Sequence, residues 1–106
     1  MRKDDEKGQF NPDSYPALLE FLPAYLHEDF VKEYGSAAKA FLALMADASG
    51  DQVRNVKQDW QALRHALAGQ RLDKVHQALR ELGSGWQPQS EQELQAVDEI
   101  LRRAQT

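Results

Sequence analysis

The chain has 106 residues, which is enough for one hydrophobic core but leaves little room for an enclosed active site. Hydrophobic residues make up 42% and charged residues 28%, a balance that is typical of soluble globular domains. There is no cysteine, which excludes disulfides, thiolate zinc sites and cysteine nucleophiles. The sequence contains no secretion signal and no apolar stretch long enough to span a membrane, so we expect a cytoplasmic protein.

The net charge of -4 is unevenly distributed along the chain. Residues 13–33 contain five acidic residues and one lysine, whereas residues 34–106 contain nine acidic and nine basic residues. Nucleic-acid binding requires clustered lysine and arginine side chains that displace counterions from the phosphates, so we expect no nucleic-acid partner. A protein partner with a basic surface matches this charge better.

The first third of the chain is predicted to contain a polar leader and one helix. Residues 1–13 are polar and are expected to be a disordered or frayed leader, which places the single folded domain at 14–106. A helix begins near Pro16, whose fixed φ angle suits the first turn. Pro23 either kinks or restarts this helix, because proline lacks a backbone N–H. Residues 27–35 are expected to form a loop or a short turn.

Apolar residues at helical spacing predict four further helices, over about residues 36–48, 51–69, 72–82 and 90–101. Asp51 is a candidate N-cap for the second of these. Ser90 and Glu93 have the spacing of a capping box at the start of the last. Turns between these helices are short and contain glycine.

No run of β-branched and aromatic residues alternates with polar ones, so no strand is expected. The sequence therefore predicts an all-α fold, a compact bundle of about five short helices. The last helix carries Asp98 and Glu99 four residues before Arg102 and Arg103, and this spacing predicts two ion pairs on its exposed face.

The adjacent residues His27, Glu28 and Asp29 raise the question of metal binding or acid–base chemistry. A helical zinc site needs ligands four residues apart, but Val31 stands four residues after His27. The alternative is that His27 or Asp29 caps a helix end or hydrogen-bonds the backbone where the chain turns. The serines all stand at expected helix ends, so we predict no catalytic residue, no metal site, no cofactor and no enzymatic activity.

The two tryptophans have different settings. Trp60 lies on the apolar stripe of its expected helix, which favours a place in the core. Trp86 lies in a loop flanked by glycine and proline, where it either plugs one end of the bundle or is an exposed anchor for a partner. The plug is the favoured interpretation.

Aromatic residues alternate with acidic ones in the segment that carries the charge deficit. A solvated acidic face is the ordinary explanation for such a segment. Carboxylates that steer a basic partner, beside rings that lose water on contact, also make a tight protein interface. On that basis the candidate partner-binding residues are Glu20, Tyr25, Glu28, Asp29, Phe30, Glu33 and Tyr34.

These residues also carry a family resemblance. The resemblance rests on the segments Tyr15-Pro16-Ala17-Leu18, Phe21-Leu22, Tyr25-Leu26-His27-Glu28-Asp29-Phe30, Tyr34-Gly35 and Leu82-Gly83. With these segments the chain resembles the immunity proteins of contact-dependent growth inhibition systems, which neutralise the toxin domain that a neighbouring bacterium delivers. The resemblance covers about residues 14–104, and it departs from the family pattern at Pro23, Glu28 and Phe30.

The resemblance implies a function in binding. The expected partner is the cognate toxin C-terminal domain, which a monomeric immunity protein would cover one to one. Such toxins are often nucleases, whose substrate groove is basic. Within such a family His27 and Asp29 can be structural, since shared motif residues tend to hold the fold. The alternative is a helical adaptor or regulatory interaction domain that has no toxin partner.

Overall fold

The computed structural model describes residues 10–104, and within this range the chain is all-α, as predicted. It forms one short 3-10 helix and six α-helices, one more α-helix than expected. Their bounds are η1 Pro12–Ser14, α2 Pro16–Tyr25, α3 Phe30–Tyr34, α4 Ala37–Asp47, α5 Gly50–Ala66, α6 Leu72–Glu81 and α7 Glu91–Arg103.

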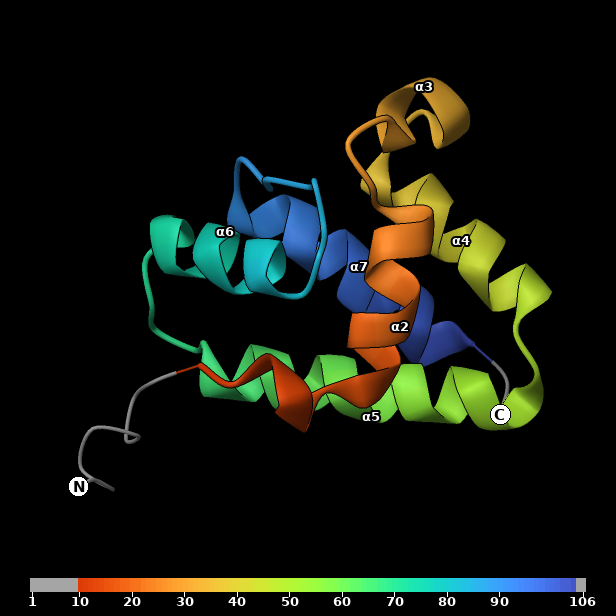
Figure 1. Cartoon of the computed structure of the whole chain (residues 1–106), viewed down its shortest axis with the longest axis horizontal. Coiled ribbons are helices and arrows are strands. Elements are labelled where there is room, and N and C mark those ends of the chain that lie inside the picture. Colours follow the sequence, from red (N-terminus) through yellow and green to blue (C-terminus); the bar gives the residue numbers. More distant parts are fainter. Residues whose placement is uncertain (1–9, 105–106) are drawn as a thin grey trace.

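The helices form a compact bundle (Figure 1). In the view of Figure 1, α5 runs along the bottom and α2 rises from it. Helix α2 packs against both α5 and α4, and α4 packs in turn against α7. The short helix α3 lies at the top, over the beginning of α4. The C-terminal end of α2 therefore lies together with α3 and α4 at one end of the molecule.

The core is centred on three aromatic side chains, Phe41, Trp60 and Trp86. The rings of Trp60 and Trp86 stack with centroids 6.3 Å apart, and Phe41 packs edge-on against both. Trp60 is 2% exposed and Trp86 is 3% exposed. The core position of Trp60 is confirmed, and the burial of Trp86 excludes its alternative role as an exposed anchor.

Structure in the described range begins before residue 14. Residues 1–9 of the expected leader lie outside the described residues. The ring of Phe10 stacks on Tyr15 with centroids 5.4 Å apart, and Asn11 caps the short helix η1 by accepting a hydrogen bond from the Asp13 N–H. Residues 10–13 therefore include an aromatic contact with Tyr15 and a capped turn of 3-10 helix.

Pro23 does not restart a helix, because α2 continues through it to Tyr25. The Leu26 N–H bonds the Leu22 carbonyl at 2.7 Å, so helical hydrogen bonding resumes directly after the proline. Gly83 provides room for the proline ring, since a Cβ at Gly83 would lie 2.7 Å from Pro23 Cγ. Close packing against this glycine holds the proline within the helix.

Two expected caps are wrong. Ser49, not Asp51, caps α5, and it forms a reciprocal capping box with Gln52. Ser90 occupies the N-cap position of α7 but its side chain makes no capping bond. Glu93 instead accepts hydrogen bonds from the Trp86 indole N–H and from the backbone N–H of Gln89. Tertiary packing thus redirects a side chain that the local pattern assigns to a box.

Candidate functional site

Three of the seven predicted partner-binding residues come together on the surface: Tyr25, Glu33 and Tyr34. Tyr25 ends α2 and Tyr34 ends α3, and their rings stack with centroids 6.1 Å apart at an interplanar angle of 26°. The Tyr25 hydroxyl donates a hydrogen bond of 2.8 Å to Asp47 Oδ2 at the end of α4. Phe21 packs one turn before Tyr25, at 6.4 Å between centroids. We call Phe21, Tyr25, Glu33, Tyr34 and Asp47 the tyrosine face.

The carboxylates of this face act on both tyrosines. The hydrogen bond to Asp47 raises the pKa of Tyr25 above its ordinary value of 10.0. Desolvation raises the pKa of Tyr34, and the charges of Glu33 and Asp47 add to the increase. Both phenols therefore remain neutral and able to donate a hydrogen bond at physiological pH.

The Asp47→Ala variant tests the hydrogen bond between Tyr25 and Asp47. We expect it to lower the pKa of Tyr25 towards 10.0, because the neutral phenol loses its carboxylate acceptor. Ring-proton shifts followed by NMR against pH report each tyrosine separately. Tyr15 is the internal control, because burial and Asp59 raise its pKa and Asp47 does not. An unchanged Tyr25 titration would show that the hydrogen bond does not form in solution.

His27 takes a structural role in the turn before α3. Its Nδ1 accepts a hydrogen bond of 3.0 Å from the Asp29 N–H, which confirms the expectation that this segment uses a side chain to bond the backbone. Because Nδ1 is an acceptor, the proton lies on Nε2, which is 2.6 Å from Glu33 Oε1. His27 thereby links the turn to α3 and holds one oxygen of Glu33.

The connector between α6 and α7 crosses this turn at close range. The Gly85 N–H donates to the Leu26 carbonyl at 2.6 Å, and the Ser84 hydroxyl donates to the same oxygen at 3.2 Å. A Cβ on Gly85 would lie 2.8 Å from the Cα of Glu28, so only glycine permits this approach. The crossing fixes the turn that separates Tyr25 from Tyr34.

The other four predicted residues do not join the tyrosine face. Phe30 is 7% exposed and belongs to the core, so it supports the surface from beneath and offers no ring to a partner. Glu28 and Asp29 line a separate polar pocket of about 660 Å³ next to Arg80. Glu20 precedes Tyr25 by five residues, which is about 140° around the helix axis, so it faces another direction.

Two members of the face, Phe21 and Asp47, were not among the predicted residues. Phe21 lies one helical turn before Tyr25, whereas Asp47 is distant in the sequence. It follows Tyr25 by 22 residues and lies on another helix, so no helical spacing relates the two. Its place in the last turn of α4 is also uninformative, because acidic residues are not favoured at helix C-termini. The contact depends on the crossing of α2 and α4.

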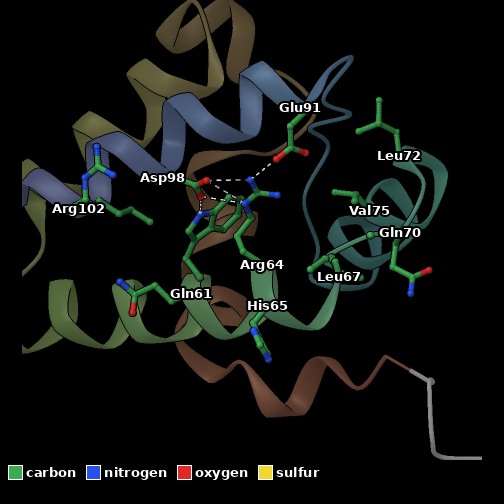
Figure 2. A pocket seen from close by; sticks show the side chains of 14 residues that line it. Gln61, Arg64, His65, Leu67, Gln70, Leu72, Val75, Glu91, Asp98 and Arg102 are labelled. Carbon is green, nitrogen blue, oxygen red and sulfur yellow. Dashed lines mark hydrogen bonds and ion pairs between the residues drawn. The ribbon is translucent and has the colours of Figure 1, made fainter.

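A second surface feature is a groove of about 810 Å³ between α5, the beginning of α6 and α7 (Figure 2). Leu67, Leu72 and Val75 line it together with Arg64, whose guanidinium lies near its centre. A groove of this size is within the range of small-molecule sites. Sequence analysis did not predict it.

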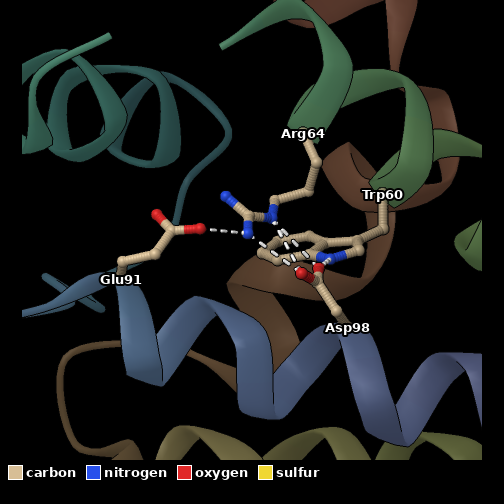
Figure 3. Close-up of polar contacts among 4 residues, drawn as sticks. All are labelled: Trp60, Arg64, Glu91 and Asp98. Carbon is tan, nitrogen blue, oxygen red and sulfur yellow. Dashed lines mark hydrogen bonds and ion pairs between the residues drawn. The ribbon is translucent and has the colours of Figure 1, made fainter. Parts of the chain in front are cut away.

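The charge of Arg64 is balanced inside the protein (Figure 3). Its Nε and Nη2 donate to Asp98 at 2.9 to 3.2 Å, and Nη2 also donates to Glu91 at 2.6 Å. Asp98 accepts a further bond of 2.6 Å from the Trp60 indole N–H. The bonds to Asp98 raise the pKa of Arg64 above its already high ordinary value. Arg64 is therefore held by two carboxylates of the protein itself.

This network corrects the predicted ion pairs of the last helix. Asp98 pairs with Arg64 on α5 and not with Arg102. Glu99 takes both neighbouring cations of α7, Arg102 and Arg103. The predicted pair of Glu99 and Arg103 is thus present, whereas the side chain of Asp98 ties α7 to the core.

Among residues 10–104, no group of three or more His, Cys, Asp and Glu side chains is arranged to hold a metal ion. In the same range, no helix has the length and hydropathy to cross a membrane. Comparisons with protein-family models, with curated proteins and with solved structures found no match to this chain.

Proposed function

We propose that this chain is an immunity protein of a contact-dependent growth inhibition system. In this proposal it binds one copy of a cognate toxin C-terminal domain in the bacterial cytoplasm and neutralises it by covering part of its surface. The function is binding and assigns no catalytic residue and no cofactor. Two features support this proposal: the resemblance carried by residues 14–104, and the chemistry of the surface that α2, α3 and α4 form.

The observation that carries the proposal is the position of the charge. Residues 10–50 contain six acidic residues and two lysines, whereas residues 51–104 contain eight acidic and eight basic residues. The net charge of -4 therefore belongs to the part of the chain that forms α2, α3 and α4. A surface of one sign attracts a partner of the other and raises the association rate by about 10 to 1,000-fold.

Apolar contact is available in the same region. Val31 on α3 is 57% exposed and Leu42 on α4 is 54% exposed, and these are the exposed large hydrophobic side chains of the described residues. Tyr25 at the end of α2 and Tyr34 at the end of α3 are also partly exposed. Interface energy comes mainly from rings and apolar groups that lose water on contact, while charges set orientation and rate.

The test is co-expression of this chain with the toxin domain encoded immediately upstream of its gene. We expect the chain to restore growth and to co-purify with the domain in equal amounts. The control is a non-cognate toxin domain, which the chain should neither bind nor neutralise. Failure of rescue while both proteins are soluble would contradict the proposal and would favour an adaptor or regulatory role without a toxin partner.

A further inference from the structure

We propose that the tyrosine face holds an arginine side chain of the protein partner, with the guanidinium over the Tyr34 ring and its N–H groups on the carboxylates of Asp47 and Glu33. This inference rests on the proposed function, since it assumes a cationic protein partner. It adds the type of side chain and the atoms that receive it.

The ring geometry provides the platform. Phe21, Tyr25 and Tyr34 form a row in which each ring packs on the next. Tyr34 ends this row, because no further aromatic ring packs against it in residues 10–104. Tyr34 is only partly buried, so part of its ring is accessible to a partner. A cation above an aromatic ring is attracted by the negative face of its π system.

The acceptor atoms belong to the same face. Asp47 uses Oδ2 for the Tyr25 hydroxyl, and Glu33 uses Oε1 for His27, while the second oxygen of each carboxylate accepts no hydrogen bond within the described residues. Asp47 and Tyr34 both contact Tyr25, and Glu33 directly precedes Tyr34 on α3. Each of these two carboxylates therefore has one oxygen without a donor in the described residues, and both belong to the tyrosine face.

No lysine or arginine among residues 10–104 forms an ion pair with Glu33 or Asp47. The two basic residues of the segment 10–50 are Lys32 and Lys39, and neither forms an ion pair with Glu33 or Asp47 in the described structure. Arginine suits the face better than lysine does. Its planar guanidinium stacks on a ring and presents donors in a fork that matches carboxylate oxygens, whereas lysine carries a compact, strongly hydrated charge.

The experiment is an NMR titration of the protein with hexa-arginine, hexa-lysine and hexa-citrulline at physiological ionic strength. We expect hexa-arginine to shift the ring protons of Tyr25 and Tyr34 most, hexa-lysine to bind about threefold more weakly and hexa-citrulline not to bind. Asp47→Asn and Tyr34→Leu should each weaken hexa-arginine about threefold or more.

The matched control is Asp73→Asn, which removes the same charge from an exposed site on α6. Equal binding by Asp47→Asn and Asp73→Asn, or largest shifts away from the two tyrosines, would overturn the inference. Asp47 is exposed, so Asp47→Asn should leave the fold intact. This variant therefore tests the inference even if Tyr34→Leu perturbs folding.

The two proposals fail in different ways. If the wild-type chain neutralises the toxin domain and Asp47→Asn and Tyr34→Leu do so equally well, then the arginine site is wrong and the immunity function stands. If the wild-type chain does not bind the toxin domain, the immunity function falls, and the peptide titration still decides whether the face binds arginine.

Discussion

The Gly85→Ala variant is expected to lower the free energy of unfolding by about 2 to 3 kcal/mol, a large effect for one methyl group. The added Cβ would lie 2.8 Å from Glu28 Cα and 2.9 Å from Glu28 N, and both atoms belong to the backbone. A flexible side chain could rotate away, but here one of two chain segments must move. The hydrogen bond of the Gly85 N–H to the Leu26 carbonyl would lengthen as they separate.

Urea denaturation of both proteins gives this difference from the shift in midpoint at constant slope. The matched control is Gly50→Ala, because a Cβ at Gly50 meets no atom within 4 Å. Gly50 is the first residue of α5, and alanine there should raise stability by up to about 1 kcal/mol. Equal stabilities for the two variants would refute the close crossing of the connector and the turn.

The Trp60→Ala variant should cost more, about 3 to 5 kcal/mol of unfolding free energy. Trp60 is 2% exposed and packs against Phe41 and Trp86, so truncation leaves a cavity in the centre of the core. It also removes the indole N–H that donates to Asp98. The loss therefore combines missing packing with a missing hydrogen bond.

Trp60→Phe keeps an aromatic ring at this position and removes the indole N–H together with part of the bicyclic ring, so most of the packing remains. We expect its loss of stability to be clearly smaller than that of Trp60→Ala. Leu42→Ala is the control for a large-to-small change on the surface, since Leu42 is 54% exposed, and it should change stability by less than about 0.5 kcal/mol. Similar losses for Trp60→Ala and Leu42→Ala would contradict the assigned core.

Helical spacing of apolar residues was sufficient to predict the all-α fold and the longer helices. Helix α3 was missed because it is only five residues long, so its periodicity cannot be told from that of a turn. Local caps were predicted less well, since Glu93 at the start of α7 bonds an indole of the core in place of the box. The partners of side chains that reach other helices depend on tertiary packing, which the spacing of residues in the sequence does not predict.

In the candidate site, too, contacts between residues near in the sequence were predicted better than contacts between distant ones. Tyr25 and Tyr34 belong to one short segment, and the turn between them brings their rings together. Asp47 is distant in sequence and joins them only because α4 crosses α2. Phe30 was expected at the surface because it alternates with acidic residues, but α3 packs against α4 and buries it. Aromatic residues beside charges can face either way, and tertiary contacts decide.

Hydrogen exchange on the chain, free and in complex with the proposed toxin partner, tests most directly whether the tyrosine face is the binding surface. Binding through the tyrosine face predicts slower amide exchange in residues 25–34 and 43–48, where the end of α2, α3 and the last turn of α4 meet. Slower exchange confined to residues 60–75 and 91–102, around the groove of α5, α6 and α7, would contradict the account.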